Sequence, residues 1–534
     1  YLYVDKTDLV YQLVKTGSYY FLSRPRRFGK SLLISTFEAY FKGKKELFEG
    51  LAVEKLEKDW LTYPVLHLDL NAKKYVSPED LTAILNQHLE RWELLYGDEK
   101  KDRSPEERFS YVIERASEKT GMRVVILIDE YDNFTNQLLT SYNDPLYEKV
   151  TTADSFLRTF FKVIKKGIGE GSIRTCFCTG VLPVTMDDLT SGYNIAEILT
   201  LESDFINMLG FTHAEADAYL RYVLDKYTGS QERYDEIWQL IVNNYDGYRF
   251  SPKGEKLFNA TILTYFLKNF ATRHGEVPEE MIDENLRTDI GWLRRLTLSL
   301  ENSKAMLDAL VIDNGLYYNV ADLSSKFNKQ KFFDKNFYPV SLFYLGMTTL
   351  FNDYRMMLPN LTMRSIYMDY YNVLNRIDGG AMRYAPVYER FTQERDFESL
   401  VRNYFEQYLG QFPAQVFDKI NENFIRCSFF ELVSRYLSSC YTFAIEQNNS
   451  EGRADFEMTG IPGTDYYTDD RLVEFKYYKA KEAEKMLGPD APLPEHVEQM
   501  HRYAEDTLRH FPNYKVRAYV VYICANRGWK CWEV

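Results

Sequence analysis

The sequence YYFLSRPRRFGKSLLISTFEAYF (Tyr19–Phe41) predicts a strand, a loop and a helix in direct succession. Tyr19–Ser23 is a short apolar and aromatic run bounded by turn-forming residues, which is typical of a strand. Ser31–Phe41 repeats its apolar side chains close to the period of a helix. The loop ends in Gly29–Ser31, where backbone N–H groups and the start of the helix can point at anionic oxygens. The stretch therefore predicts a phosphate-binding loop.

One position of this loop departs from the usual pattern GxxxxGK[ST], because Arg24 stands where that pattern has its first glycine. A residue other than glycine fits there if its φ is negative, so the prediction survives the departure. In such a loop Lys30 reaches the β- and γ-phosphates and the Ser31 hydroxyl holds Mg²⁺. The alternative is a helix start with a surface lysine, beside a solvated basic turn formed by Arg24, Arg26 and Arg27.

A second strand supplies the carboxylates that a nucleotide site needs. Val124–Asp129 (VVILID) runs from five apolar residues into Asp129, and Glu130 follows it. A buried strand with a carboxylate at its end can hold Mg²⁺ there, and the adjacent glutamate can polarise the attacking water. The next strand ends at Thr179, whose hydroxyl can sense the γ-phosphate. The alternative for VVILID alone is a strand that enters a polar turn. The residues predicted to bind the nucleotide are Arg26, Arg27, Phe28, Gly29, Lys30, Ser31, Leu32, Asp129 and Thr179.

The order of elements predicts an α/β fold in the N-terminal part of the chain. Short β-branched or Leu-rich runs at Val65–Leu70, Val124–Asp129, Ile173–Thr179 and Ile198–Leu201 are mostly separated by segments with helical pattern. This alternation favours a parallel sheet covered by helices, with an added strand between the two motif strands. Helices are then predicted at His213–Tyr227, Tyr234–Asn244 and Ala260–Phe270, followed by a mostly helical connecting region.

Near the C-terminus, acidic and basic residues recur on predicted strands. The expected order is a helix at Phe424–Ser439, strands at Tyr441–Gln447, Arg453–Met458 and Arg471–Tyr477, a helix at His496–Arg509 and a strand at Val516–Cys524. Glu474 and Lys476 are two residues apart on one strand and therefore share a face. Asp455 lies in the preceding strand of the same hairpin.

This D…ExK pattern suits metal-dependent hydrolysis of a phosphodiester. Carboxylates from Asp455 and Glu474 can bind Mg²⁺, and Lys476 can position or help deprotonate the attacking water and stabilise negative charge. Glu446 and Gln499 are candidates for support of this centre. The alternatives are alternating charges on a solvated strand face and a surface glutamine.

Composition limits the classes of protein that remain. The chain has 534 residues, is 45% hydrophobic and 27% charged, and has a net charge of −13. This charge argues against coating of nucleic acid by charge alone, although a local basic groove remains compatible with it. The six cysteines lack zinc spacing, which favours free thiols in a reducing cytoplasm. No apolar run reaches the roughly 18 residues of a membrane span, and no signal peptide is evident, so a cytoplasmic protein without membrane contact is expected.

Together the motifs resemble those of bacterial and archaeal proteins that join an AAA-ATPase-like domain of P-loop NTPase fold to a C-terminal PD-(D/E)xK nuclease-superfamily domain. The matching stretches occur in family order: YVDKT (Tyr3–Thr7), RPRRFGKS (Arg24–Ser31), LIDEYD (Leu127–Asp132), TGV (Thr179–Val181), GFT (Gly210–Thr212), YDGYRF (Tyr245–Phe250), GRADF (Gly452–Phe456) and VEFK (Val473–Lys476). The resemblance implies Walker A and Walker B elements that bind ATP and Mg²⁺ through Lys30, Ser31 and Asp129, with Glu130 acting on water. It also implies a restriction-endonuclease-like nuclease centre at Asp455, Glu474 and Lys476 that uses Mg²⁺ or Mn²⁺. An acidic residue on the preceding helix often assists the metal in this superfamily, so the resemblance makes Glu431 a candidate, with an ordinary surface glutamate as the alternative.

From the motifs and the resemblance we expect four parts: an ATPase domain at 1–211, a helical lid at 212–300, a connecting region at 301–422 and a nuclease-like domain at 423–534. The expected function is an ATPase that controls cleavage of DNA or RNA by a chain that can form homo-oligomers, and the architecture is compatible with a role in defence against foreign nucleic acid. The alternative is a signalling or scaffold ATPase whose nuclease-like domain binds nucleic acid or protein without cleaving it. Arg249 can reach the γ-phosphate from the lid, or belong to a structural turn.

Overall fold

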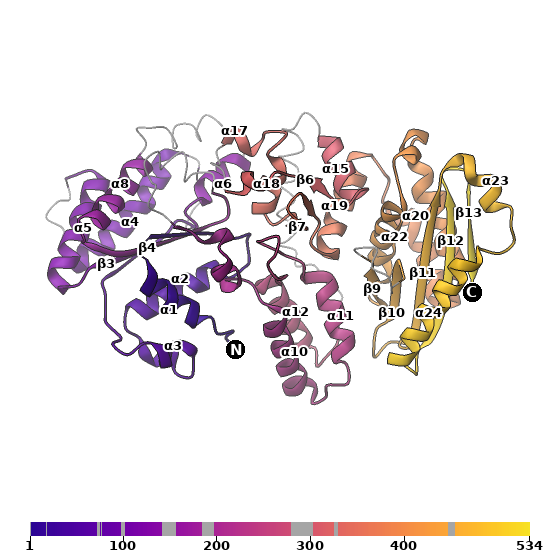
Figure 1. The fold of residues 1–534 in the computed structure, drawn as a ribbon, viewed down its shortest axis with the longest axis horizontal. Helices are drawn as coiled ribbons and strands as arrows, with labels where there is room; N and C mark the ends of the chain where they lie inside the picture. Colours follow the sequence, from indigo (N-terminus) through magenta and orange to yellow (C-terminus); the bar gives the residue numbers. More distant parts are fainter. Residues whose placement is uncertain are drawn as a thin grey trace.

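The computed structural model describes residues 2–17, 19–71, 75, 77–97, 102–140, 156–183, 197–278, 303–324, 329–446 and 454–534. They form an elongated molecule with one large sheet toward each end and mainly helices between them (Figure 1). None of the helices in this part of the chain has the length and apolarity that crossing a bilayer requires. All six cysteines are free. The two large sheets and the helices between them confirm the predicted α/β fold class and the helical middle.

The N-terminal sheet is parallel and has the strand order β2-β3-β4-β1-β5. Its strands are β1 (Tyr19–Ser23), β2 (Val65–Asp69), β3 (Val124–Asp129), β4 (Ile173–Gly180) and β5 (Glu197–Ile198). β4 is the strand added between the two motif strands β1 and β3, whereas β2 lies at the edge. The expected strand at Ile198–Leu201 is wrong beyond its first residue, because Leu199–Leu201 forms a 3₁₀ turn.

Helices cover both faces of this sheet. One layer contains α1 (Thr7–Thr16), α2 (Lys30–Phe41) and α3 (Ala52–Leu56), and the opposite layer contains α4 (Pro78–Tyr96), α5 (Pro105–Thr120) and α8 (Phe156–Gly169), while α6 (Asn133–Thr140) follows β3 (Figure 1). β1 and β3 are buried along their whole length, as their continuous apolar sequences require. Because the strands are parallel, the carboxyl ends of β1, β3 and β4 lie next to one another at the same end of the sheet.

The middle of the chain is helical, as predicted, with one small sheet that the sequence did not reveal. The three expected helices are α10 (His213–Thr228), α11 (Tyr234–Tyr245) and α12 (Ala260–Thr272), and they share a separate apolar core. They are followed by α15 (Ser303–Val311), α16 (Val320–Leu323), α17 (Lys329–Phe332), α18 (Tyr338–Tyr344), α19 (Leu361–Leu374), α20 (Ala381–Glu394) and α21 (Phe397–Asn403). The small antiparallel sheet contains β6 (Leu316–Tyr317), β7 (Thr349–Leu350) and β8 (Arg355–Met357).

The C-terminal sheet is mixed and has the strand order β13-β12-β11-β10-β9. Its elements are α22 (Glu422–Leu437), β9 (Tyr441–Ile445), β10 (Phe456–Gly460), β11 (Asp469–Tyr478), α23 (Ala483–Leu487), α24 (Pro494–His510), β12 (Lys515–Cys524) and β13 (Gly528–Glu533). The expected order of helix, three strands, helix and strand is confirmed, and β13 is an addition. α22 packs on one face of the sheet and α24 on the other (Figure 1). β10 starts at Phe456, so Asp455 immediately precedes the strand in which it was expected, and Arg453, the expected first residue, lies outside the described residues.

Candidate nucleotide and nuclease sites

The loop between β1 and α2 has the backbone of an anion-binding turn. Gly29 takes a left-handed conformation with a φ of 99° immediately before α2, and no side chain caps the start of this helix. Lys30 is only 4% exposed, and its Nζ donates hydrogen bonds to the backbone carbonyls of Arg24 and Pro25, both at 3.2 Å. Ser31 and Leu32 are exposed on the first turn. An uncapped helix start beside a buried lysine fits the phosphates of a nucleotide.

Arg24 has a structural role where the usual loop has glycine. It is buried, and its Nη1 donates to the carbonyls of Ser23 (3.0 Å) and Thr200 (2.8 Å), while its Nη2 donates to that of Ile206 (3.2 Å). Its guanidinium also lies 4.1 Å from the centre of the Phe250 ring. Burial lowers the pKa of Arg24 to about 9, so the side chain keeps its charge at neutral pH. The arginine therefore fixes the loop from within.

Two of the predicted nucleotide residues from other strands meet beside this loop. Thr179 at the end of β4 donates a 2.7 Å hydrogen bond from its hydroxyl to Oδ1 of Asp129 at the end of β3. Glu130 follows with a φ of 52°, and its Oε1 lies 3.7 Å from Lys30 Nζ. The sheet thus gathers Lys30, Asp129, Glu130 and Thr179 at one edge. These groups can hold a Mg²⁺–nucleotide and a water molecule, in agreement with the chemistry of their donor set.

Asp132 was not assigned a role from the sequence, although it lies inside the motif LIDEYD. It is fully buried and accepts hydrogen bonds from the backbone N–H groups of Val181 (3.1 Å) and Leu182 (2.7 Å). Burial, and then the charge of Glu130, raise the pKa of Asp132 to about 6. Its carboxyl group ties the turn after β3 to the chain that leaves β4, and so positions Asp129 and Thr179.

The motif Tyr245–Phe250 packs directly against the phosphate-binding loop. The ring of Phe28 lies edge-on to Tyr248 (5.2 Å between centres) and to Phe250 (5.4 Å). Phe28 is therefore a core residue whose backbone, not its ring, is available to a nucleotide. Two residues at the start of α12 hold neighbouring carbonyls of the loop: the Asn259 side-chain amide donates to the Arg26 carbonyl at 3.3 Å, and the Thr261 N–H donates to the Arg27 carbonyl at 3.0 Å.

Arg249 belongs to a structural turn, which was one of its two alternatives. Its backbone N–H donates to the hydroxyl of Thr349 at 2.7 Å, and its Nη1 donates to the carbonyl of Phe351 at 3.3 Å. These contacts direct Arg249 toward the small sheet of the middle region. The idea that it reaches the γ-phosphate is not supported by this arrangement.

The C-terminal sheet brings the predicted nuclease residues together. Phe475 donates its backbone N–H to Oδ2 of Asp455 at 2.9 Å, which fixes the two strands of the hairpin. Lys476 Nζ lies 2.7 Å from Oε1 of Glu474, and Gln499 Nε2 from α24 donates to the same oxygen at 3.1 Å. Asp455 and Glu474 are 5% and 3% exposed. Gln499 therefore lies at the centre and is not a plain surface residue.

The electrostatics of this centre suit a cation. Burial, and then repulsion by Asp455, raise the pKa of Glu474 to about 7. Burial opposes the charge of Lys476, but Glu474 and Glu422 outweigh it and raise the pKa of Lys476. In the described part of the chain no group of three or more His, Cys, Asp or Glu is arranged as a metal site. Mg²⁺ commonly uses one or two carboxylates together with water and phosphate, so Asp455 and Glu474 fit it as a pair.

Helix α22 brings to this centre two residues that were not predicted from the sequence, Glu422 and Arg426. A third residue of the helix, Glu431, has a different role from the one expected. Oε2 of Glu422 lies 3.7 Å from Lys476 Nζ, and Arg426, one turn later, lies 2.9 Å from Oδ1 of Asp455. Arg426 is also 3.7 Å from Oε2 of Glu446, so Glu446 reaches the centre through the arginine. Glu431 is neither a metal helper nor a surface residue. It is buried and pairs with Arg435 on its own helix. It also accepts a hydrogen bond from the side-chain amide of Asn372 on α19.

Comparisons with known proteins agree with this geometry. Residues 1–190 match the family described as predicted AAA-ATPase (AAA-ATPase-like), and residues 420–533 match the PD-(D/E)XK nuclease superfamily. The chain joins an AAA-ATPase-like domain to a PD-(D/E)XK nuclease-superfamily domain. It is also similar to the "Uncharacterized protein in vnfD 5'region" of Azotobacter chroococcum mcd 1, with 32% identity over 260 residues. That alignment covers 48% of this chain and 47% of the relative, so the chain spans about half the length of the curated relative it matches. No solved structure matches the chain significantly.

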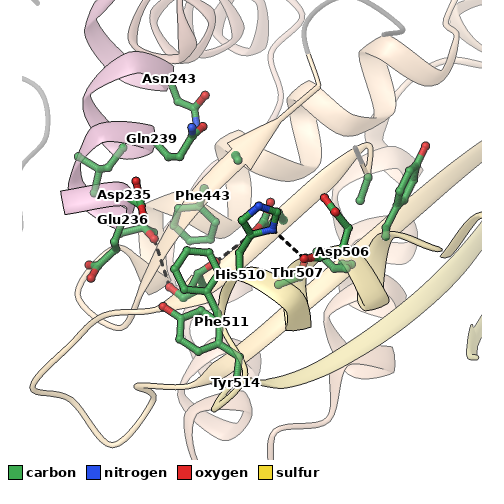
Figure 2. A pocket seen from close by; sticks show the side chains of 18 residues that line it. Asp235, Glu236, Gln239, Asn243, Phe443, Asp506, Thr507, His510, Phe511 and Tyr514 are labelled. Carbon is green, nitrogen blue, oxygen red and sulfur yellow. Dashed lines mark hydrogen bonds between the residues drawn. The ribbon is translucent and has the colours of Figure 1, made fainter. Parts of the chain in front are cut away.

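A pocket of about 390 Å³ lies between helix α11 of the middle region and the nuclease-superfamily domain (Figure 2). Asp235, Gln239 and Asn243 of α11 form one wall, and residues of β9, β10 and α24 form the other. Its lining includes Ala454, next to Asp455, and Tyr503, whose hydroxyl lies 2.8 Å from Gln499 Nε2. The pocket therefore borders the predicted nuclease residues and is walled on one side by α11.

Proposed function

We propose that this chain is a nucleotide-controlled, metal-dependent phosphodiesterase that acts on DNA or RNA. The observation that carries the proposal is the approach of Glu474 to Lys476, 2.7 Å apart, beside Asp455 within a nuclease-superfamily domain. The AAA-ATPase-like domain at residues 1–190 supplies the controlling part. The division into 1–211, 212–300, 301–422 and 423–534 is part of this proposal.

In the proposed nucleotide site, Lys30 would contact the β- and γ-phosphates, and Ser31 and Asp129 would hold Mg²⁺. Glu130 would orient the attacking water, and its 3.7 Å separation from Lys30 Nζ supports this role. The hydrogen bond from Thr179 to Asp129 keeps that carboxylate oriented and links the end of β4 to the reacting group.

In the proposed nuclease centre, Asp455 and Glu474 would hold a divalent ion, which activates water and stabilises charge on the phosphate. Lys476 keeps its proton, because neighbouring carboxylates raise its pKa. We therefore assign it to orienting water and stabilising negative charge, in preference to removing a proton. Gln499 fixes one oxygen of Glu474 and leaves the other free to face the ion.

A continuous series of contacts supports control of the nuclease by the nucleotide. Phe28 of the loop packs on Tyr248 and Phe250, and the adjacent Asp246 is bonded to Asn360 at the start of α19. α19 packs along α22, the helix that carries Glu422 and Arg426. Cleavage measured with and without ATP tests whether this route couples the two sites.

Cleavage should be measured on plasmid, single-stranded DNA and RNA, with Mg²⁺ or Mn²⁺, and with and without ATP. Lys476→Ala should abolish cutting, and Lys30→Ala should remove the effect of ATP while leaving basal cutting. Lys530→Ala is a matched control, because this lysine lies on β13 of the same sheet and bonds the carbonyl of Pro489. An absence of cutting under every condition would instead favour a domain that binds nucleic acid or protein without cleaving it.

A further inference from the structure

Arg426 is placed where a cation is needed between two carboxylates. It is 7% exposed, and its Nη1 lies 2.9 Å from Oδ1 of Asp455 and 3.7 Å from Oε2 of Glu446. The other oxygen of Asp455 is bonded to the backbone N–H of Phe475. A guanidinium is permanently charged, so this contact is present over the whole working pH range.

We infer that Arg426 takes the place of a second metal ion, so that the nuclease centre binds one divalent cation. This inference rests on the proposed phosphodiesterase function. Asp455 and Glu474 would hold that ion, and Asp455 would at the same time keep its contact with the arginine. A second ion between Asp455 and Glu446 would have to occupy the volume that the guanidinium already fills.

The balance of charge around the centre also indicates that it binds one divalent cation. Its acidic groups are Glu422, Glu446, Asp455 and Glu474, and its basic groups are Arg426 and Lys476. The carboxylates exceed the cations by two, which one divalent ion neutralises. A second ion would leave an excess of positive charge in a largely buried site, and uncompensated buried charge is strongly unfavourable. Arg426 is thus a positioning residue that sets the metal stoichiometry.

The test is to count Mn²⁺ bound to the full chain without nucleotide, by electron paramagnetic resonance and calorimetry. Wild type should bind one ion that Glu474→Gln removes, which assigns the ion to this centre. Arg426→Met should bind two ions there, because Asp455 and Glu446 then lack their counter-ion. Arg426→Lys keeps the charge and should still bind one.

Arg435→Met provides the matched control. Arg435 is on the same helix and pairs with a buried carboxylate, Glu431, away from the centre. This variant should bind one ion, as wild type does.

Two ions in wild type, or one ion in a folded Arg426→Met, would overturn the inference and leave the proposed function intact. If Arg426→Met does not fold, Arg426→Gln is the second neutral variant, and one ion in a folded Arg426→Gln would likewise overturn the inference. The absence of any ion sensitive to Glu474→Gln would overturn the proposed function as well as the inference.

Discussion

Asn360 donates a 2.8 Å hydrogen bond from its side-chain amide to the backbone carbonyl of Asp246, although 114 residues separate the two in the sequence. The carbonyl oxygen of the same side chain accepts from the N–H of Met363 and so caps α19. One buried amide thus joins the turn that packs on the phosphate-binding loop to a helix that packs on the nuclease-superfamily domain. Because the nitrogen makes the link to Asp246 and the oxygen caps α19, a substitution can remove the link and keep the cap.

Asn360→Asp should uncouple the nucleotide from the nuclease. Aspartate keeps the acceptor that caps α19 but loses the amide donor, which leaves the Asp246 carbonyl unpaired at a cost of about 1–3 kcal/mol. Basal cleavage should persist while the change caused by ATP disappears, in the same cleavage assay. Asn319→Asp is the control, since Asn319 also caps a helix, α16, through its side-chain oxygen. An ATP effect of normal size in Asn360→Asp would contradict this route.

Gly247→Ala should weaken the same junction by steric conflict. Gly247 has a φ of 101°, and an added Cβ would lie 2.1 Å from the backbone carbonyl oxygen of Pro359, which cannot turn away. Thermal unfolding should show a loss well above the roughly 1–2 kcal/mol that a left-handed backbone alone costs. Gly121→Ala measures that backbone cost by itself, because Gly121 has a φ of 67° and nothing within 4 Å of an added Cβ. Equal losses in the two variants would show that the junction can relax.

The large sheets could be predicted because their strands are specified locally. Val124–Asp129 is a continuous apolar run that ends in a carboxylate, and Tyr19–Ser23 leads into a glycine turn and an amphipathic helix. The placement of β4 between them depends on pairing across more than 150 residues and was foreseen only as a class of topology. The two- and three-residue strands β6, β7 and β8 are too short to show a period, so the sequence could not reveal them.

The residues of the nuclease centre that belong to the β10–β11 hairpin could be predicted from the sequence. Alternation along β11 puts Glu474 and Lys476 on one face, and the hairpin brings Asp455 to them. Glu422 and Arg426 were missed because they come from a helix, and their approach depends on how α22 packs on the sheet. Glu431 was a candidate through the family resemblance, but its burial serves a pair with Arg435.

Metal binding at the nuclease centre should depend steeply on pH. The pKa of Glu474 is raised to about 7, and the metal binds its deprotonated form, so Mn²⁺ affinity should fall about tenfold per pH unit below 7. Titrations at pH 5.5, 6.5 and 7.5 measure this slope. For the metal-free protein the sign is opposite: the stability that this protonated carboxyl contributes is present at low pH and lost as the pH rises through about 7.

The variant Glu431→Gln separates the effect of pH on metal affinity from its effect on stability. Burial also raises the pKa of Glu431 to about 7, so this group alters stability over the same pH range. It lies away from the centre, and its substitution should leave the slope of Mn²⁺ affinity unchanged. A pH-independent affinity in wild type would show that Glu474 does not ligate the ion.

Arg24→Gly would restore the first glycine of the pattern GxxxxGK[ST], yet it should weaken the nucleotide site. The change removes three hydrogen bonds to buried carbonyls and the contact with the Phe250 ring. Loss of these buried contacts should cost about 2–5 kcal/mol of stability, and nucleotide affinity should fall because the loop loses its internal support. Thermal unfolding and titration with a fluorescent ATP analogue measure both effects. Arg26→Gly adds the same backbone freedom to the loop and should cost much less, because Arg26 is only half-buried. Tighter ATP binding by Arg24→Gly would show instead that the arginine merely obstructs an ordinary phosphate-binding loop.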